Sequence, residues 1–171
     1  FINKMDRPAL SPFELMDNVE KVLGITAVPL TYPIGDGPGF RGVYERSTGI
    51  LHLFEKTEGN KYRAPVSTKG IHDPGFKSLI GEDAHAKFIE EIELVEAALP
   101  AFEHEAFLQE IIIPVFFGSG ITTFGIENFL QYFASDDETK VALSYIENVG
   151  NGESLLQAMK HITAVKPLVV L

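Results

Sequence analysis

The stretch Ile111-Ile112-Ile113-Pro114-Val115-Phe116-Phe117 is apolar at every position. A strand that faces solvent on one side alternates apolar and polar residues, whereas a strand covered on both faces does not. The run therefore predicts a strand of a parallel sheet with helices on both sides. Gly118-Ser119-Gly120 follows the run and ends the strand.

Two amphipathic helices are predicted upstream of this strand. Ser11 is a favourable N-cap, Pro12 suits the first helical position, and Glu14 completes a capping box, so a helix begins there and ends at Gly24. Residues 82–99 form the second helix. Its apolar face comprises Ala84, Phe88, Ile92, Val95 and Leu99, and its solvent face comprises Glu90, Glu91, Glu93 and Glu96.

The other segments complete an α/β pattern. Turn and strand signals predict a strand over 25–34, a hairpin over 43–54 that turns at residues 47–49, and a strand near residues 62–66. Short helices are expected over 102–110 and 125–134. Residues 140–171 read as a strand, a helix over 152–165 and a strand over 167–171, which is a βαβ unit. The fold class is therefore α/β, a mostly parallel sheet flanked by helices, with a small β-rich insertion near residues 41–70.

Composition limits the possible functions. The 171 residues carry 14 basic and 24 acidic side chains, a net charge of −10, and no cysteine. Such an acidic chain repels nucleic acid backbones, so no direct nucleic acid binding is expected. The lack of cysteine removes thiol catalysis and cysteine-ligated metals. No apolar run approaches the roughly 20 residues of a membrane helix. We expect a cytoplasmic chain without a metal or resident cofactor, cut from a longer protein because it starts at Phe1.

The tetrapeptide Asn3-Lys4-Met5-Asp6 matches the Asn-Lys-x-Asp pattern by which GTP-binding proteins select guanine. The carboxylate accepts hydrogen bonds from the ring N–H and the exocyclic amine of guanine, and adenine offers neither arrangement. In this interpretation Asp6 reads the base, Lys4 covers it with its aliphatic stem, and Asn3 braces the neighbouring loops. The alternative interpretation is a polar strand end with a capping aspartate.

A second loop fits the same pocket. Gly118-Ser119-Gly120 follows the buried strand, and its small residues would let a backbone N–H, assigned to Ser119, approach the guanine carbonyl oxygen. The loop Gly35-Asp36-Gly37-Pro38-Gly39 superficially resembles a phosphate-binding loop. Such a loop must open a helix, however, and a strand-like segment follows here. A phosphate site at residues 35–39 is therefore disfavoured.

Several segments together resemble the G domain of translational GTPases, and within these the release factor three family of peptide chain release factors. The resemblance covers residues 1–134. It is carried by residues 1–7, 32–35, 40–44, 81–83, 91–95 and 114–118, which read FINKMDR, YPIG, FRGVY, GED, EIELV and PVFFG.

The resemblance implies that residues 1–134 are the C-terminal half of a G domain, with the family's insertion over about 41–110. The intact family binds GTP or GDP with Mg²⁺, and the ribosome. The phosphate-binding pattern Gly-x-x-x-x-Gly-Lys-Ser/Thr is not found in these 171 residues. We therefore expect no catalytic residues and no GTP hydrolysis. Guanine nucleotide would bind weakly if at all, through Asn3, Lys4, Asp6 and Ser119.

The C-terminal segment resembles a different family. Residues 137–141, 145–147, Gly152 and 166–171 are similar to the succinyl-CoA-synthetase-like, flavodoxin-like region of NDP-forming acyl-CoA synthetases. A domain boundary is expected at 134–135. The βαβ unit that resembles the second family would pair with strand 111–117 and so extend its sheet. His161 reads as an ordinary helix-surface histidine. Alternatives to a GTPase-derived piece are a natural domain fusion or an engineered chimera without activity of its own, or a CoA-related binding module.

Overall fold

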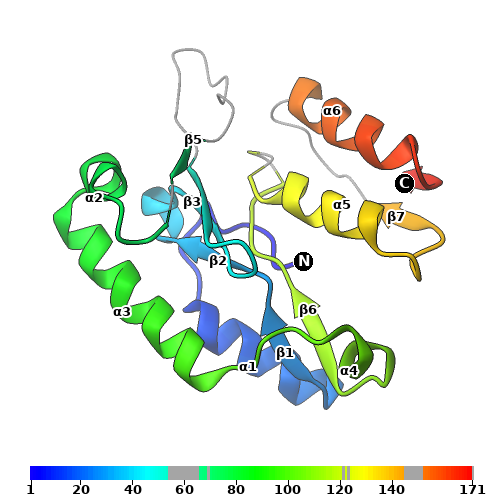
Figure 1. The fold of residues 1–171 in the computed structure, drawn as a ribbon, viewed down its shortest axis with the longest axis horizontal. Coiled ribbons are helices and arrows are strands. Elements are labelled where there is room, and N and C mark those ends of the chain that lie inside the picture. Colours follow the sequence, from blue (N-terminus) through cyan, green and yellow to red (C-terminus); the bar gives the residue numbers. More distant parts are fainter. Residues whose placement is uncertain (54–65, 69, 121, 123, 145–151, 171) are drawn as a thin grey trace.

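The structure is a computed structural model that describes residues 1–53, 66–68, 70–120, 122, 124–144 and 152–170. Figure 1 shows its elements. In chain order they are α1 (Pro12–Leu23), β1 (Thr26–Pro29), β2 (Thr31–Ile34), the short 3₁₀ helix η1 (Gly37–Gly39), β3 (Gly42–Glu45), β4 (Ile50–Leu53), β5 (Val66–Thr68), α2 (Pro74–Ile80), α3 (Glu82–Ala98), α4 (His104–Leu108), β6 (Ile112–Val115), α5 (Ile126–Ser135), β7 (Ala142–Ser144), α6 (Gly152–Thr163) and β8 (Leu168–Val170).

The apolar run forms β6 and is paired on both edges. β1 lies parallel to β6, with Thr26 opposite Ile112. On the other edge the backbone N–H of Ile2 donates to the carbonyl oxygen of Phe116 at 2.7 Å, and the N–H of Gly118 donates to the carbonyl oxygen of Ile2 at 3.0 Å. This segment is therefore an inner strand between two parallel neighbours.

Residues 25–34 do not form the single predicted strand. The chain changes sheets at Leu30, whose N–H donates to the carbonyl oxygen of Val115 and whose own carbonyl oxygen accepts from the N–H of Arg46. β1 therefore belongs to the parallel pair, while β2 begins an antiparallel sheet of order β2-β3-β4-β5. The sequence prediction failed because this division depends on which strand each half meets.

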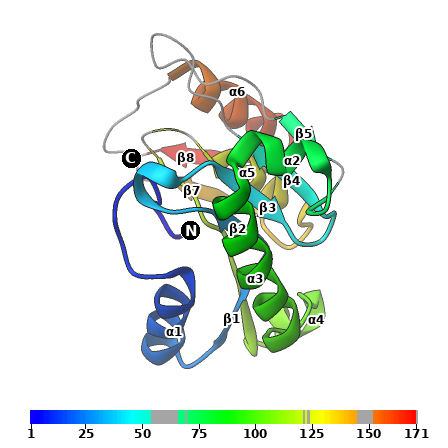
Figure 2. The same ribbon diagram turned by 90° about the vertical axis from the view of Figure 1, so that its left-hand side faces the viewer.

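The antiparallel sheet packs against α3. Figure 2 shows α3 crossing in front of these strands. The predicted helix over 82–99 is confirmed as one continuous helix, and the predicted hairpin is confirmed as β3 and β4. Phe88, Ile92 and Val95 are buried against β2 and β4. Of the four glutamates expected in solvent, Glu91 is half-buried, which corrects that prediction, and residues 62–65 of the predicted third strand lie outside the described residues.

Helix α1 begins as its sequence predicts. The Ser11 hydroxyl accepts from the N–H of Glu14, the Glu14 carboxylate accepts from the N–H of Ser11, and Gly24 closes the helix with φ of 70°. Its residue Met16 is buried in the core that also contains Val115 and Phe117. Among the described residues, no helix is long and apolar enough to cross a membrane.

The C-terminal segment forms the predicted parallel strands, with Ala142 opposite Leu168, but they are a separate two-stranded sheet. The expectation that they would extend the sheet around β6 is wrong in the described residues. Helix α5 lies between β6 and α6 (Figure 1), and α6 packs on α5 through Ile162 and Leu130. The α/β class is confirmed: the described residues contain the parallel pairs β1-β6, extended by the Ile2 segment, and β7-β8, together with the antiparallel sheet β2-β3-β4-β5.

Candidate guanine-recognition site

The Asn3–Asp6 motif folds as a tight turn at the edge of β6. The N–H of Arg7 donates to the carbonyl oxygen of Lys4 at 3.0 Å, which closes the turn around Met5 and Asp6. Lys4 adopts a left-handed φ of 70°, which costs energy in a residue with a Cβ and marks a constrained position. The turn therefore holds one conformation close to the end of a central strand.

Met5 anchors this turn. Its side chain is 1% exposed, its N–H donates to the carbonyl oxygen of Gly118 at 3.0 Å, and its carbonyl oxygen accepts from the N–H of Gly37 at 2.8 Å. Both backbone groups of the residue before Asp6 are thus hydrogen-bonded to segments distant in sequence. The sequence analysis gave Met5 no role, and its apolar side chain inside a polar motif was the available signal.

Asn3 joins the two predicted loops. Its Oδ1 accepts from its neighbour's backbone, the N–H of Lys4, and from the N–H of Gly120, each at 2.7 Å. Gly120 lies so close that an added Cβ would be 3.3 Å from Asn3 Nδ2. The motif and the Gly118–Gly120 turn, 117 residues apart in sequence, therefore form one constellation.

Ser119 is buried in this turn, and its polar groups are occupied. Its backbone N–H, the donor expected for the base, donates instead to the carbonyl oxygen of Phe124 at 2.9 Å. Its hydroxyl oxygen accepts from the N–H of Thr122 at 3.3 Å. In this arrangement Ser119 shapes the loop, and its N–H is not free to reach a base.

Lys4 and Asp6 remain available to a ligand. The Lys4 side chain is exposed and Asp6 is half-buried. The Asp6 carboxylate has no hydrogen-bond partner among the described residues, although the backbone on either side of it is fixed. A held carboxylate with unused lone pairs can accept two adjacent N–H donors.

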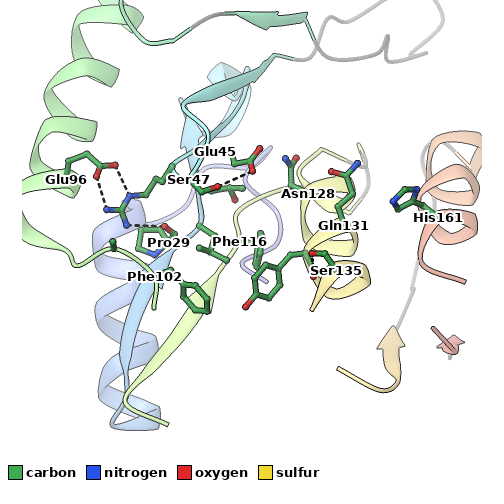
Figure 3. Close-up of a pocket in the computed structure, with 15 residues that line it drawn as sticks. Pro29, Glu45, Ser47, Glu96, Phe102, Phe116, Asn128, Gln131, Ser135 and His161 are labelled. Carbon is green, nitrogen blue, oxygen red and sulfur yellow. Dashed lines mark hydrogen bonds and ion pairs between the residues drawn. The ribbon is translucent and has the colours of Figure 1, made fainter. Parts of the chain in front are cut away.

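A separate cleft of about 670 Å³ opens between the β3–β4 hairpin and α5 (Figure 3), and none of the four predicted site residues lines it. Arg46, whose side chain is 8% exposed, donates to the Glu96 carboxylate at 2.8 and 3.0 Å and to the carbonyl oxygen of Pro29. The buried hydroxyl of Tyr132 finds no hydrogen-bond partner among the residues that the structure describes. Burial, with Asp136 nearby, raises the pKa of Tyr132 to about 12. The exposed His161 lies across from α5.

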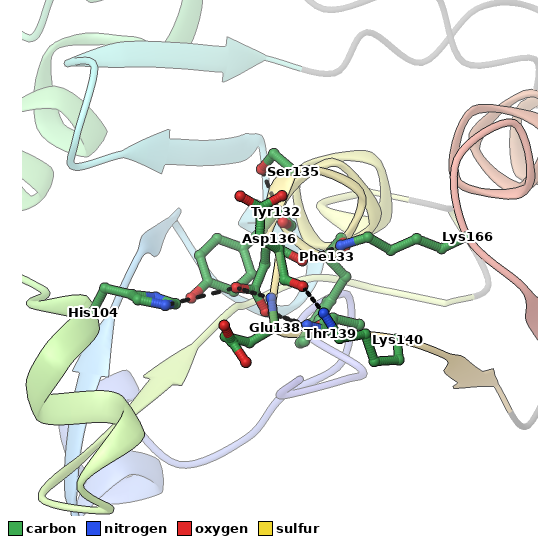
Figure 4. A network of polar contacts seen from close by, with 10 residues as sticks. His104, Tyr132, Phe133, Ser135, Asp136, Glu138, Thr139, Lys140 and Lys166 are labelled. Atoms are coloured by element: carbon green, nitrogen blue, oxygen red, sulfur yellow. Dashed lines mark hydrogen bonds and ion pairs between the residues drawn. The ribbon is translucent and has the colours of Figure 1, made fainter.

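Polar contacts join α5 to the C-terminal segment (Figure 4). The ammonium of Lys166 donates to the carbonyl oxygens of Phe133, at 2.8 Å, and of Asp136. Asp136 in turn accepts from the hydroxyl of Thr139 at 2.5 Å. A cation over the last carbonyl groups of a helix satisfies acceptors that the helix leaves unpaired. Within the described ranges, no three metal-ligating side chains come together.

Comparison with known proteins finds two sequence similarities, one for each segment of the chain. The chain is 48% identical over 135 residues to peptide chain release factor 3 of Synechocystis sp., a match that covers 78% of this chain and 24% of the relative. Peptide chain release factor 3 of Gloeobacter violaceus is 45% identical, and that of Symbiobacterium thermophilum 40%, each over 133 residues, 78% of this chain and 25% of the relative. Most of the chain resembles peptide chain release factor 3. It spans about a quarter of the length of these curated relatives.

A second similarity covers the C-terminus. Residues 117–171 match the family described as succinyl-CoA ligase like flavodoxin domain. The release factor 3 similarity covers 78% of the chain, which leaves less than a quarter of it uncovered. Residues 117–171 are about a third of the chain, so the two matches overlap. The resemblances of both segments are thus confirmed, and the flavodoxin-like match begins before α5, upstream of the boundary expected at residue 134.

Proposed function

We propose that residues 1–134 are the base-reading part of a release-factor-3-like G domain and that the Asn3–Asp6 turn selects guanine. The observation that carries this proposal is the Asn3 Oδ1 atom, which accepts from the N–H of Lys4 within the turn and from the N–H of Gly120 in the Gly118–Gly120 loop, each at 2.7 Å, while the Asp6 carboxylate has no partner among the described residues. Asp6 would accept from the guanine edge and Lys4 would lie over the base. Asn3 would brace the two loops. Ser119 would donate its N–H only after exchanging its bond with Phe124.

The complete protein would then bind GTP or GDP with Mg²⁺ and act on the ribosome during translation termination. These 171 residues alone would not hydrolyse GTP, because they contain no Gly-x-x-x-x-Gly-Lys-Ser/Thr loop to hold the phosphates for in-line transfer. GTP hydrolysis that co-purifies with the chain and disappears in an Asp6→Asn variant would contradict this expectation.

Binding by these residues is expected to be weak but base-selective. Each base contact contributes about 0.5–1.5 kcal/mol net. Association costs about 4–15 kcal/mol, which a few such contacts barely offset. Adenine would leave the Asp6 carboxylate unpaired, so the preference for guanine should persist even at low affinity.

Ligand-observed NMR with guanosine, GDP and ADP tests the proposal. We expect guanosine and GDP to bind more tightly than ADP, and Asp6→Asn to abolish the difference because an amide replaces one of the two acceptor oxygens with an NH2 donor, which opposes one of the two N–H groups on the guanine edge. Asp17→Asn on the exposed face of α1 is the matched control and should retain it. Equal weak binding of GDP and ADP would instead mean that Asn3, Lys4 and Asp6 are only a polar strand end and do not select a base.

A second candidate function follows from the C-terminal match alone. The family description of residues 117–171 names a CoA ligase, so we propose CoA as a further ligand for the same titration. CoA binding that survives Asp6→Asn would favour the CoA-related module.

A further inference from the structure

The loop Gly35–Gly39 lies directly behind the base-reading turn. Gly37 is buried, its N–H donates to the carbonyl oxygen of Met5 at 2.8 Å, and the loop is closed by the N–H of Phe40 donating to the Gly37 carbonyl oxygen at 3.1 Å. The sequence analysis set this glycine-rich segment aside because it opens no phosphate-binding helix. Its contact with Met5 gives it a different use.

Gly37 also lies close to the two residues that follow Asp6. A Cβ added there would lie 3.3 Å from the backbone nitrogen of Pro8 and 3.5 Å from the carbonyl carbon of Arg7. Its φ of 51° is a left-handed conformation that a side chain would strain. The added Cβ would press on Arg7 and Pro8, the two residues that follow Asp6. The atoms it meets belong to their backbone and cannot move aside as the end of a flexible side chain could.

We infer that the Gly35–Gly39 loop sets the position of Asp6 for the base, with Gly37 as a positioning residue. This inference rests on the proposed function. Met5 is held from two sides, by Gly118 after the inner strand and by Gly37 in the loop between β2 and β3 of the antiparallel sheet. The orientation of the Asp6 carboxylate therefore depends on the β2–β5 sheet as well as on the parallel pair. Guanine selectivity becomes sensitive to whatever displaces that sheet.

The matched test compares Gly37→Ala with Gly49→Ala. Gly49 has a similarly left-handed φ of 72°, but an added Cβ there meets nothing within 4 Å. The two variants thus share the conformational cost, and only Gly37→Ala presses on the base-reading turn. We expect Gly37→Ala to reduce the preference for guanosine over adenosine about tenfold, since small displacements of a positioned group have large effects. Gly49→Ala should leave the preference unchanged.

Amide hydrogen exchange supplies a readout that needs no nucleotide. The N–H groups of Met5 and Arg7 are hydrogen-bonded in the turn, and Gly37→Ala should accelerate their exchange while Gly49→Ala does not. If Gly37→Ala does not fold, Pro38→Gly loosens the same loop at an exposed site without adding an atom, and should shift both readouts in the same direction.

The outcomes separate the two proposals. If the unaltered chain shows no preference for guanine, the proposed function fails. Amide hydrogen exchange at Met5 and Arg7 is then the readout that tests the positioning role of Gly37. Faster exchange at Met5 and Arg7 confined to Gly37→Ala or Pro38→Gly supports that role. Equal effects of Gly37→Ala and Gly49→Ala on selectivity and on exchange overturn it.

Discussion

Asp136 occupies the end of α5 and is 8% exposed. Its carboxylate accepts from the hydroxyl and N–H of Thr139 and from the N–H of Glu138, and His104 Nε2 lies 3.9 Å away. Burial alone would raise the pKa of Asp136. The hydrogen bonds and His104 outweigh burial, so the pKa lies below its ordinary value of 3.8. The charged form is therefore favoured by the fold.

This shift predicts a specific acid sensitivity. A carboxyl group whose pKa is lower in the folded state stabilises the fold above its unfolded pKa, and the contribution disappears as pH falls through the folded value. Urea unfolding should show the chain losing stability below pH 3.8, with a smaller loss in Asp136→Asn, which has no proton to gain. Asp137→Asn, at the exposed neighbour, should behave like the unaltered chain. An identical pH profile for all three would refute the assignment.

At the scale of the element, α3 carries the core of the antiparallel sheet. The Phe88 ring is 2% exposed and meets Phe76 and Tyr44 edge-on, at centroid distances of 5.5 and 5.9 Å. Leu94 on the same helix is 55% exposed. The two positions lie in the interior of the same helix and differ chiefly in burial, so they form a matched pair.

Phe88→Ala should lower the free energy of unfolding by about 3–5 kcal/mol, the usual range for removing a buried aromatic ring. Leu94→Ala should change it by less than about 0.5 kcal/mol because it removes no buried contact. Urea denaturation with circular dichroism measures both. Equal losses would mean that Phe88 is not in the core.

These elements also show what local sequence can predict. The Ser11–Glu14 capping box and the spacing of Phe88 and Ile92 define their helices from neighbouring residues, and both helices are present. The change of sheet at Leu30 was missed because it depends on Val115, far along the chain. The candidate base-reading residues Asn3 and Asp6 could be identified from the four-residue motif alone. That Asn3 braces a neighbouring loop was also expected from the motif. The contact of Met5 with Gly37 could not be predicted, because no local rule relates such distant positions.

At the scale of the whole molecule, the two segments that resemble different families share α5. Leu130 packs against Ile162 on one side of this helix, and Lys166 donates to carbonyl oxygens at its C-terminal end. On the other side, Asn128 Nδ2 lies 3.1 Å from His52 Nε2 of the β3–β4 hairpin. The C-terminal segment is therefore attached through a helix and not through a continuous sheet.

Lys166→Met should weaken this attachment. Hydrogen bonds from a charged group contribute about 1.5–3 kcal/mol, so α6 should exchange its amide hydrogens at least about tenfold faster. Lys160→Met on the exposed face of α6 is the control and should change little. Mass spectrometry of peptides from residues 152–170 gives the readout. Unchanged exchange in Lys166→Met would show that apolar packing alone holds the segment.

The pairing of β1 with β6 has a consequence for the order of folding. Thr26 meets Ile112, and Ile2 meets Phe117, so both contacts close very long loops, whereas β2, β3 and β4 pair with their immediate successors. Loop closure entropy makes distant parallel pairings slow. On a nascent chain, the hairpins would form while the Asn3–Asp6 segment still lacks Gly118 and Gly120. The turn that would read the base is thus synthesised well before the residues that complete it, and it is among the last parts of the chain to acquire its native shape.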